Sequence, residues 1–233
     1  AGLTITASKT YDATTTATIT GAATLLSQST GSGNSADGKI YTVDTLVTLS
    51  GTALANYNNK DVLTASTISI SGLSLSGAGS SNYTLLPLSQ SGTITPKNLT
   101  MTGLTLVSSS KTYDGNTTAA LQNATGLLQS PSAAGTGTSG DGVPYTGDSV
   151  TLSGAAAANY TTKNVGTGLT IVFSGVGLSG AEAGNYTLTQ QSALSNGVIT
   201  PKNLSVANTT VANKIYDTTT LASLPNGSLV GLI

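Results

Sequence analysis

Lysine and aspartate flank a tyrosine at the same spacing three times along the chain. Lys9-Thr10-Tyr11-Asp12 returns as Lys111-Thr112-Tyr113-Asp114 and as Lys214-Ile215-Tyr216-Asp217. A lysine beside an aspartate or asparagine can form an intramolecular isopeptide bond, but this chemistry needs a buried lysine and a nearby protonated acid. Acids are scarce, since Glu182 is the single glutamate among nine acidic residues. We therefore favour a turn capped by the aspartate, with the lysine stem on apolar surface.

Two further pairs of aspartates precede a predicted strand in successive copies of the pattern: Asp37 with Asp44, and Asp141 with Asp148. A calcium site needs six to eight oxygen ligands, with several carboxylates close together. One pair per copy is a weak match, so a polar turn is the favoured interpretation. We predict no metal site and no cofactor.

Catalytic constellations are missing from the sequence. The chain has no cysteine and no histidine, which Ser-His-Asp and Cys-His catalysis require. Glu182 has no counterpart in the first copy, where Gly79 occupies its position. The glycine-rich stretches 31–33 and 135–137 lack the lysine and helix of a phosphate loop, and are interpreted as long loops that could contact a binding target. We expect a protein that is not an enzyme.

All nine tyrosines fall in matched sets. Tyrosines can stack on sugars, or they can anchor a strand in the core of their own domain. The alternation of apolar and polar residues around Tyr83 and Tyr186 favours anchoring. Tyr57 and Tyr160 stand in polar, turn-like surroundings, so they are the candidates for an exposed contact surface. The remaining sets are Tyr11 with Tyr113 and Tyr216, and Tyr41 with Tyr145.

These matches belong to an internal repeat of about 100 residues, the size of a domain. Val47-Thr48-Leu49-Ser50-Gly51 returns as Val150-Thr151-Leu152-Ser153-Gly154, and Thr95-Pro96-Lys97-Asn98 returns as Thr200-Pro201-Lys202-Asn203. Proline ends strands, so Pro96 and Pro201 are the predicted junctions. The expected domains are residues 1–96, residues 97–201 and a truncated third copy, 202–233.

Period-two alternation dominates the local pattern, as in Val47-Thr48-Leu49 and Ile68-Ser69-Ile70, and glycine-bearing turns separate the apolar runs. No segment has a convincing helical stripe. The expected fold is all-β, with tandem immunoglobulin-like β-sandwich repeats; a β-grasp-like small β-fold is the alternative.

Charge and hydropathy exclude several partners. Eight cations, all lysine, stand against nine acids, and only 7% of the chain is charged, so there is no basic footprint for nucleic acid. No apolar run approaches the ~20 residues that span a bilayer. The N-terminal residues lack the pattern of a signal peptide. We predict neither nucleic-acid binding nor membrane insertion.

The repeated blocks resemble the YDG-type repeat domains of bacterial filamentous-haemagglutinin-like surface and secreted exoproteins. The similarity is carried by Lys111-Thr112-Tyr113-Asp114-Gly115, Gly147-Asp148, Gly184-Asn185-Tyr186-Thr187-Leu188 and Ile199-Thr200-Pro201-Lys202. In the first copy Ala13 replaces the glycine of the motif. The resemblance implies export to the cell surface, tandem arrays, a place in adhesion or biofilm matrix, and no catalytic residues.

The expected function is therefore a structural or adhesive module that forms a stalk or self-assembled fibre. A module that binds host or matrix glycans or proteins through its loops is the alternative. An isolated part of a repeat should not order alone, so residues from about Leu204 to 233 are expected to dock on a neighbouring repeat or copy by strand addition.

Overall fold

The computed structural model describes residues 2–31, 36–135, 138–223 and 227–232. The described residues form short β-strands, two 3-10 turns and no α-helix, which confirms the all-β expectation. The strands are distributed over several small sheets, and the immunoglobulin-like arrangement of two sheets stays a prediction. Within the described ranges, no helix is long and apolar enough to cross a membrane.

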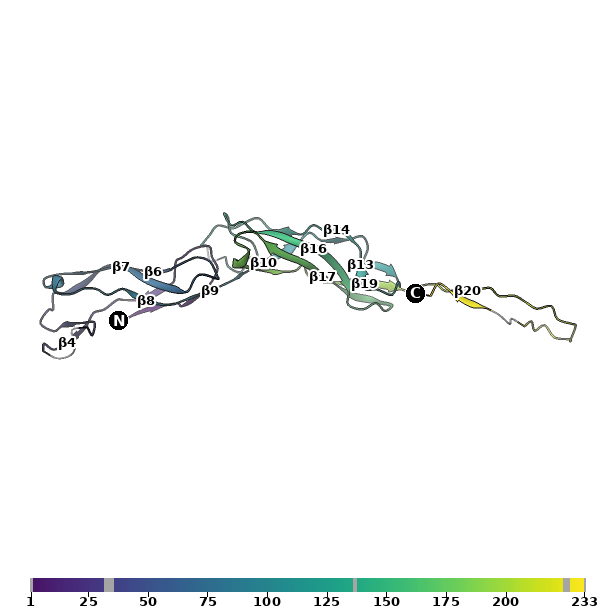
Figure 1. Cartoon of the computed structure of the whole chain (residues 1–233), viewed down its shortest axis with the longest axis horizontal. Helices are drawn as coiled ribbons and strands as arrows, with labels where there is room; N and C mark the ends of the chain where they lie inside the picture. Colours follow the sequence, from purple (N-terminus) through teal and green to yellow (C-terminus); the bar gives the residue numbers. More distant parts are fainter. Residues whose placement is uncertain (1, 32–35, 136–137, 224–226, 233) are drawn as a thin grey trace. The chain divides into compact units, whose positions relative to one another are not determined.

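The chain divides into two compact units that cut across the sequence repeat. Figure 1 labels strands of both units, with the chain coloured along its sequence. Unit 1 contains residues 1–101, 128–153 and 177–189, and unit 2 contains residues 102–127, 154–176 and 190–233. Unit 1 thus combines the first repeat with three segments of the second. The contact between these two repeats therefore lies inside one unit.

Unit 1 is built around a three-stranded antiparallel sheet, β6-β7-β8. In β6 and β7, Leu49 pairs with Leu75 and Tyr57 with Ile68. Its first-repeat strands are β1 (Leu3–Ile5), β2 (Ser8–Thr10), β3 (Ile19–Gly21), β4 (Leu26–Gln28), β5 (Lys39–Tyr41), β6 (Thr48–Tyr57), β7 (Thr67–Ser76), β8 (Leu88–Ser91) and β9 (Thr93–Thr95), with the 3-10 turn η1 (Ser80–Asn82).

A second three-stranded sheet, β15-β10-β18, follows directly after Pro96. Its strands are β10 (Lys97–Thr102), β15 (Leu127–Leu128) and β18 (Tyr186–Thr189), and the 3-10 turn η2 (Ala183–Asn185) precedes β18. β10 and β18 run parallel, with Lys97 opposite Tyr186 and Leu99 opposite Leu188. Parallel strands need a long connection between them. β10 lies at the beginning of the second repeat and β18 near its end, so their pairing brings the two ends of the repeat together.

Unit 2 contains two small strand pairs and most of the five-stranded sheet β12-β19-β17-β16-β13, of which residues 151–153 and 177–179 belong to unit 1. β16 and β17 repeat the long hairpin of β6 and β7. The strands are β11 (Thr105–Leu106), β12 (Ser110–Thr112), β13 (Thr118–Ala119), β14 (Leu121–Asn123), β16 (Thr151–Tyr160), β17 (Gly166–Ser179), β19 (Leu194–Thr200), β20 (Ser205–Ala207) and β21 (Ser228–Val230).

Glycine fixes an irregularity in the long hairpin. Gly51 and Gly72 both have positive φ angles, 87° and 80°, and the register of β6 and β7 shifts just after Gly51. A Cβ on Gly51 would overlap the carbonyl oxygen of Gly72. Gly154 and Gly175 repeat the positive φ angles in β16 and β17. The glycine of Val-Thr-Leu-Ser-Gly is therefore required by backbone packing.

The core of unit 1 is small and rich in tyrosine. Its members are Tyr11, Ala17, Ala55, Tyr57, Ala65, Ile68, Ile94, Leu99, Tyr145 and Tyr186. Because these come from both repeats, part of this core forms only when the second repeat packs on the first.

Candidate interface between successive repeats

The Lys-x-Tyr-Asp motif forms one loop in all three copies, here called the corner loop. In the first, the Lys9 ammonium donates to the Asp12 carboxylate (2.6 Å) and to the backbone carbonyls of Thr14 (2.8 Å) and Thr16 (2.9 Å). The Asp12 carboxylate in turn accepts the Thr14 amide (2.9 Å). A cation surrounded by oxygen acceptors fits the capped-turn interpretation.

The other two corner loops repeat these contacts. Lys111 lies 2.8 Å from Asp114, and Lys214 lies 2.7 Å from Asp217. The hydrogen bond from each lysine holds the pKa of its aspartate partner, Asp114 or Asp217, below the usual range.

The turn after the aspartate has a positive φ angle in every copy. The angle is 61° at Ala13, 81° at Gly115 and 63° at Thr218. The replacement of the motif glycine by Ala13 therefore leaves the turn unchanged and places a side chain in a region that favours glycine.

The two prolines end strands, as the sequence predicted. β9 stops at Thr95 before Pro96, and β19 stops at Thr200 before Pro201. These threonines accept the backbone amides of the corner tyrosines: Tyr11 donates to Thr95 and Tyr113 to Thr200, each at 2.8 Å. The strand before each proline thus holds the corner tyrosine in place.

Tyr11 lies where the second repeat covers the first. Its ring is fully buried and lies 5.3 Å from the Tyr186 ring and 5.9 Å from the Tyr145 ring. Its hydroxyl donates to Asp148 (2.8 Å), and so does the hydroxyl of Tyr186 (2.6 Å). Two tyrosines from successive repeats thus share one carboxylate.

Lys60 brings a positive charge to this cluster. Its ammonium donates to the Tyr11 hydroxyl (3.2 Å) and to Asp61 (2.9 Å), and lies 3.9 Å from the Asp148 carboxylate. Burial lowers the pKa of Lys60, but the hydrogen bond to Asp61 and the neighbouring acids outweigh this and raise it overall. The same hydrogen bond holds the pKa of Asp61 below its ordinary value.

Burial and the Asp148 carboxylate together raise the pKa of Tyr11 and of Tyr186 well above the ordinary range. Both tyrosines therefore remain neutral hydrogen-bond donors at neutral pH.

A buried asparagine forms the second polar contact between the repeats. Asn185 is 4% exposed; its side-chain oxygen accepts the amide of Val62 (2.8 Å), and its side-chain nitrogen donates to Asp61 (2.8 Å). Both polar atoms of the amide are thus satisfied by the first repeat.

Lys97 is fully buried at the first residue of β10. Its ammonium lies 2.8 Å from Asp141 and 3.7 Å from the centre of the Tyr145 ring. The contact with Asp141 is an ion pair outside the aligned geometry of a hydrogen bond. Burial raises the pKa of Asp141, but the Lys97 ammonium and the Val143 amide outweigh this and lower it.

The prediction that Tyr57 and Tyr160 form an exposed contact surface is wrong. They are 3% and 2% exposed, at the ends of β6 and β16. Their hydroxyls donate to Thr93 (3.3 Å) and Ser109 (2.9 Å). Gly92 and Gly197 have no side chain, which lets these rings pack closely: a Cβ on either would lie 2.8 Å from the ring. The polar sequence around them belongs to the turn that follows, while the rings point into the core.

Sequence reasoning placed the three corner tyrosines in the repeat pattern but missed their neighbours. The sequence pattern favours a polar turn at Asp148, and no local pattern singles out Lys60 or Asn185 as contacts between repeats. The available signal was that an aspartate and a tyrosine recur at matched positions of both copies, as Asp44 with Tyr83 and as Asp148 with Tyr186. Ser32, Gly33, Thr136 and Gly137 of the expected binding loops lie outside the described residues.

Comparison with known proteins identifies the repeat. The family model of the YDG domain matches residues 1–92 and again residues 95–193. No curated protein and no solved structure matches the chain.

Proposed function

This chain belongs to the YDG domain family, and we propose that it is a non-catalytic structural module of a bacterial extracellular surface protein. In this role its repeats form a segment of a stalk or fibre that serves cell adhesion or a biofilm matrix. The packed contact between the first two repeats is the observation that carries the proposal.

The junction has the character of a domain core. Tyr11, Lys97 and Tyr145 are each fully buried there. No free linker separates the repeats, because β9 ends at Thr95 and β10 begins at Lys97. Domains joined by an exposed linker move relative to each other by default, whereas a shared buried core holds two repeats in one arrangement. A stalk needs such a fixed arrangement.

The composition suits closely packed repeats. Low charge allows repeats to pack closely, since like-charge repulsion is weak, and the chain has net charge -1. The alternative, glycan binding on exposed tyrosines, loses its support because Tyr57 and Tyr160 are buried.

Distance measurement between spin labels tests the stiffness of the junction. The chain has no cysteine, so cysteines at the exposed positions Thr52 and Ala181 label the two repeats selectively. A pair at Thr52 and Ser89, within the first repeat, is the matched control. We expect equally narrow distance distributions; a much broader distribution for Thr52 with Ala181 contradicts a stalk.

Antibody labelling of intact cells that produce the parent protein tests its location. We expect labelling of unpermeabilised cells that disappears after external protease treatment. Labelling that requires permeabilisation contradicts a surface protein.

A further inference from the structure

We propose that the side chains of Lys97 and Asp141 join in an intramolecular isopeptide bond within the second repeat. The bond would link the first residue of β10 to the loop that precedes Tyr145. Its formation does not depend on the proposed stalk function, and only its effect under tension rests on that function.

Lys97 occupies a core position of β10. Side chains alternate between the two faces of a strand, so Lys97 shares a face with Leu99 and Met101. These three residues are 0%, 0% and 2% exposed. A lysine is almost never buried so completely unless its charge is paired. Lys97 is the only fully buried lysine among the described residues, so its surroundings need an explanation.

The buried ammonium lacks the acceptors that its charge requires. An ammonium has three donors, yet that of Lys97 has no aligned acceptor among the described residues. It lies 2.8 Å from Oδ1 of Asp141 and 3.7 Å from the centre of the Tyr145 ring. The Lys9 ammonium, by contrast, donates to one carboxylate and two carbonyls. A buried charge with unused donors is costly, whereas an amide has no charge and a single N–H.

The loop that contains Asp141 is held against β10. The Thr100 amide donates to the Gly142 carbonyl (2.9 Å), and a Cβ on Gly142 would lie 2.6 Å from Oγ1 of Thr100. Because a carboxyl C–O bond is about 1.2 Å long and Oδ1 lies 2.8 Å from the Lys97 nitrogen, the Asp141 carboxyl carbon lies within about 4 Å of that nitrogen. The fold thus keeps nucleophile and electrophile together, which favours reaction between them.

The ion pair contains every atom that the reaction needs. One proton passes from the Lys97 ammonium to the Asp141 carboxylate, which gives a neutral amine and a protonated acid. The nitrogen lone pair then attacks the carboxyl carbon, so a C–N bond forms and the C–O bond to Oδ2 breaks. The departing hydroxyl takes a proton from the nitrogen and leaves as water. One amide N–H remains, and no third acid is required to balance the step.

The surroundings of Asp141 suit this reaction. The Val143 amide donates to Oδ1 (3.0 Å), so it can stabilise the oxyanion that forms when the nitrogen attacks. The Asp141 side chain is 27% exposed, which gives the leaving water a path to solvent. Because the pKa of Asp141 is lowered, the neutral pair is a minor species. The bond should therefore accumulate slowly after folding.

The position of the bond gives it an effect under tension. Lys97 directly follows Pro96, where the first repeat passes into the second. A bond to Asp141 would carry force across the side chains and leave the segment between the two residues unextended. In a stalk, this cross-link would limit how far the second repeat lengthens when the array is pulled.

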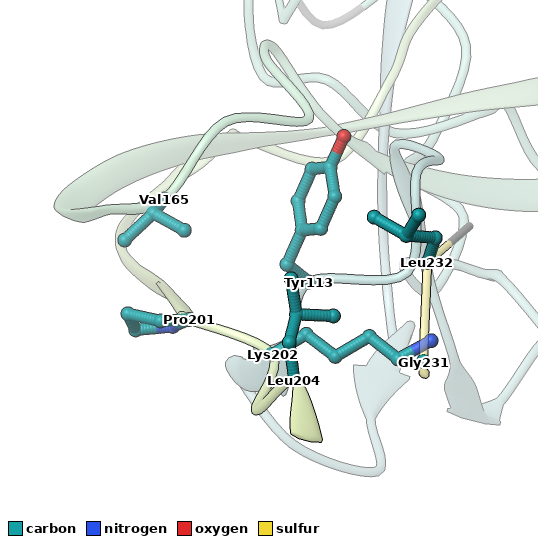
Figure 2. Close-up of a pocket in the computed structure, with 7 residues that line it drawn as sticks. All are labelled: Tyr113, Val165, Pro201, Lys202, Leu204, Gly231 and Leu232. Atoms are coloured by element: carbon teal, nitrogen blue, oxygen red, sulfur yellow. The ribbon is translucent and has the colours of Figure 1, made fainter. Parts of the chain in front are cut away.

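Lys202, the counterpart of Lys97 in the repeat, provides a matched control. It is half-buried and lines a pocket with Tyr113, Val165 and Pro201 (Figure 2). The ion pairs of the described residues do not include it. A substitution at Lys202 should therefore leave the bond intact.

The mass of the intact, folded chain tests the proposal. After incubation at neutral pH, we expect the main species to be lighter than the sequence mass by one water molecule. Trypsin should then release a branched peptide in which tandem mass spectrometry locates the link between Lys97 and Asp141. Lys97→Arg keeps the cation but removes the amine, so it should retain the full sequence mass. Lys202→Arg should lose water as the unchanged chain does.

A second route to the same mass is separated by these variants. Asp141 precedes Gly142, and an aspartate before glycine can lose water by forming a succinimide with the backbone. That route stays open in Lys97→Arg, so water loss that persists in this variant overturns the proposal. An unchanged chain that keeps its full mass after prolonged incubation also overturns it. Circular dichroism checks that Lys97→Arg folds; if it does not, the presence or absence of the branched peptide in the unchanged chain decides.

Single-molecule extension provides an independent measurement. The unchanged chain should reach full extension about 150 Å shorter than Lys97→Arg, because each residue between Lys97 and Asp141 spans about 3.4 Å when extended. Equal extensions overturn the proposal. The spin-label distances between Thr52 and Ala181 do not depend on the bond, so a failure here leaves the stalk function separately testable.

Discussion

The hydroxyl of Tyr11 donates to the Asp148 carboxylate at 2.8 Å, although the two residues are 137 positions apart and belong to successive repeats. The tyrosine is fully buried and its hydroxyl also accepts a hydrogen bond from Lys60. A hydrogen bond to a charged acceptor contributes more than a neutral one. This contact is one of those that couple the folding of the two repeats.

Tyr11→Phe is expected to lower the free energy of unfolding by about 2 kcal/mol, because it removes a hydrogen bond to a charged group and leaves Asp148 with one donor fewer. Chemical denaturation measures the change. Tyr145→Phe is the matched control: the Tyr145 hydroxyl is buried and has no hydrogen-bond partner among the described residues. Its removal should be neutral or stabilising by up to about 1 kcal/mol. Equal losses for both variants would show that the Tyr11 hydrogen bond contributes nothing.

Asn185→Ala is expected to destabilise the junction by about 2 kcal/mol, since it leaves the Val62 amide and the Asp61 carboxylate without their partner. Asn82→Ala, at the exposed counterpart, should change stability in the monomer by no more than about 0.5 kcal/mol. Hydrogen exchange at the Val62 amide localises the effect. Unchanged protection there in Asn185→Ala would contradict the assigned role.

The repeat pattern predicted the strands and turns well because each copy contains its own alternation of apolar and polar residues and its own turn glycines. It also placed the corner motif correctly as a capped turn, since Lys9, Asp12 and Thr14 are neighbours in sequence. It failed for Tyr57 and Tyr160, because a tyrosine at the end of a strand can point inward while the next residues form a polar turn. It missed the Tyr11–Asp148 contact, because long-range partners leave no local signal in a single sequence.

Ala13→Gly is expected to stabilise the first corner loop by up to about 1 kcal/mol, because Ala13 has a φ angle of 61° and an L side chain in that region is strained. The reciprocal change, Gly115→Ala at φ 81°, should destabilise by a similar amount. Thermal or chemical unfolding of both variants makes the comparison. A stabilising Gly115→Ala would contradict the turn geometry.

Alkaline pH is expected to weaken the junction. The pKa of Tyr11 and of Tyr186 is raised in the folded state by burial and by Asp148, whereas the unfolded value is about 10. The folded state therefore holds its protons more tightly, so the stabilisation is fully present below about pH 10 and is lost as pH rises toward the folded pKa.

Denaturation curves collected from about pH 8 to pH 11 should show this loss. Other tyrosines also titrate, so Tyr11→Phe provides the control and should lose less stability over the same range. Stability that is constant or that increases above about pH 10 would contradict the shared carboxylate. A loss of the same size in Tyr11→Phe would assign the alkaline effect to other tyrosines, because only the coupling through Asp148 distinguishes the two proteins.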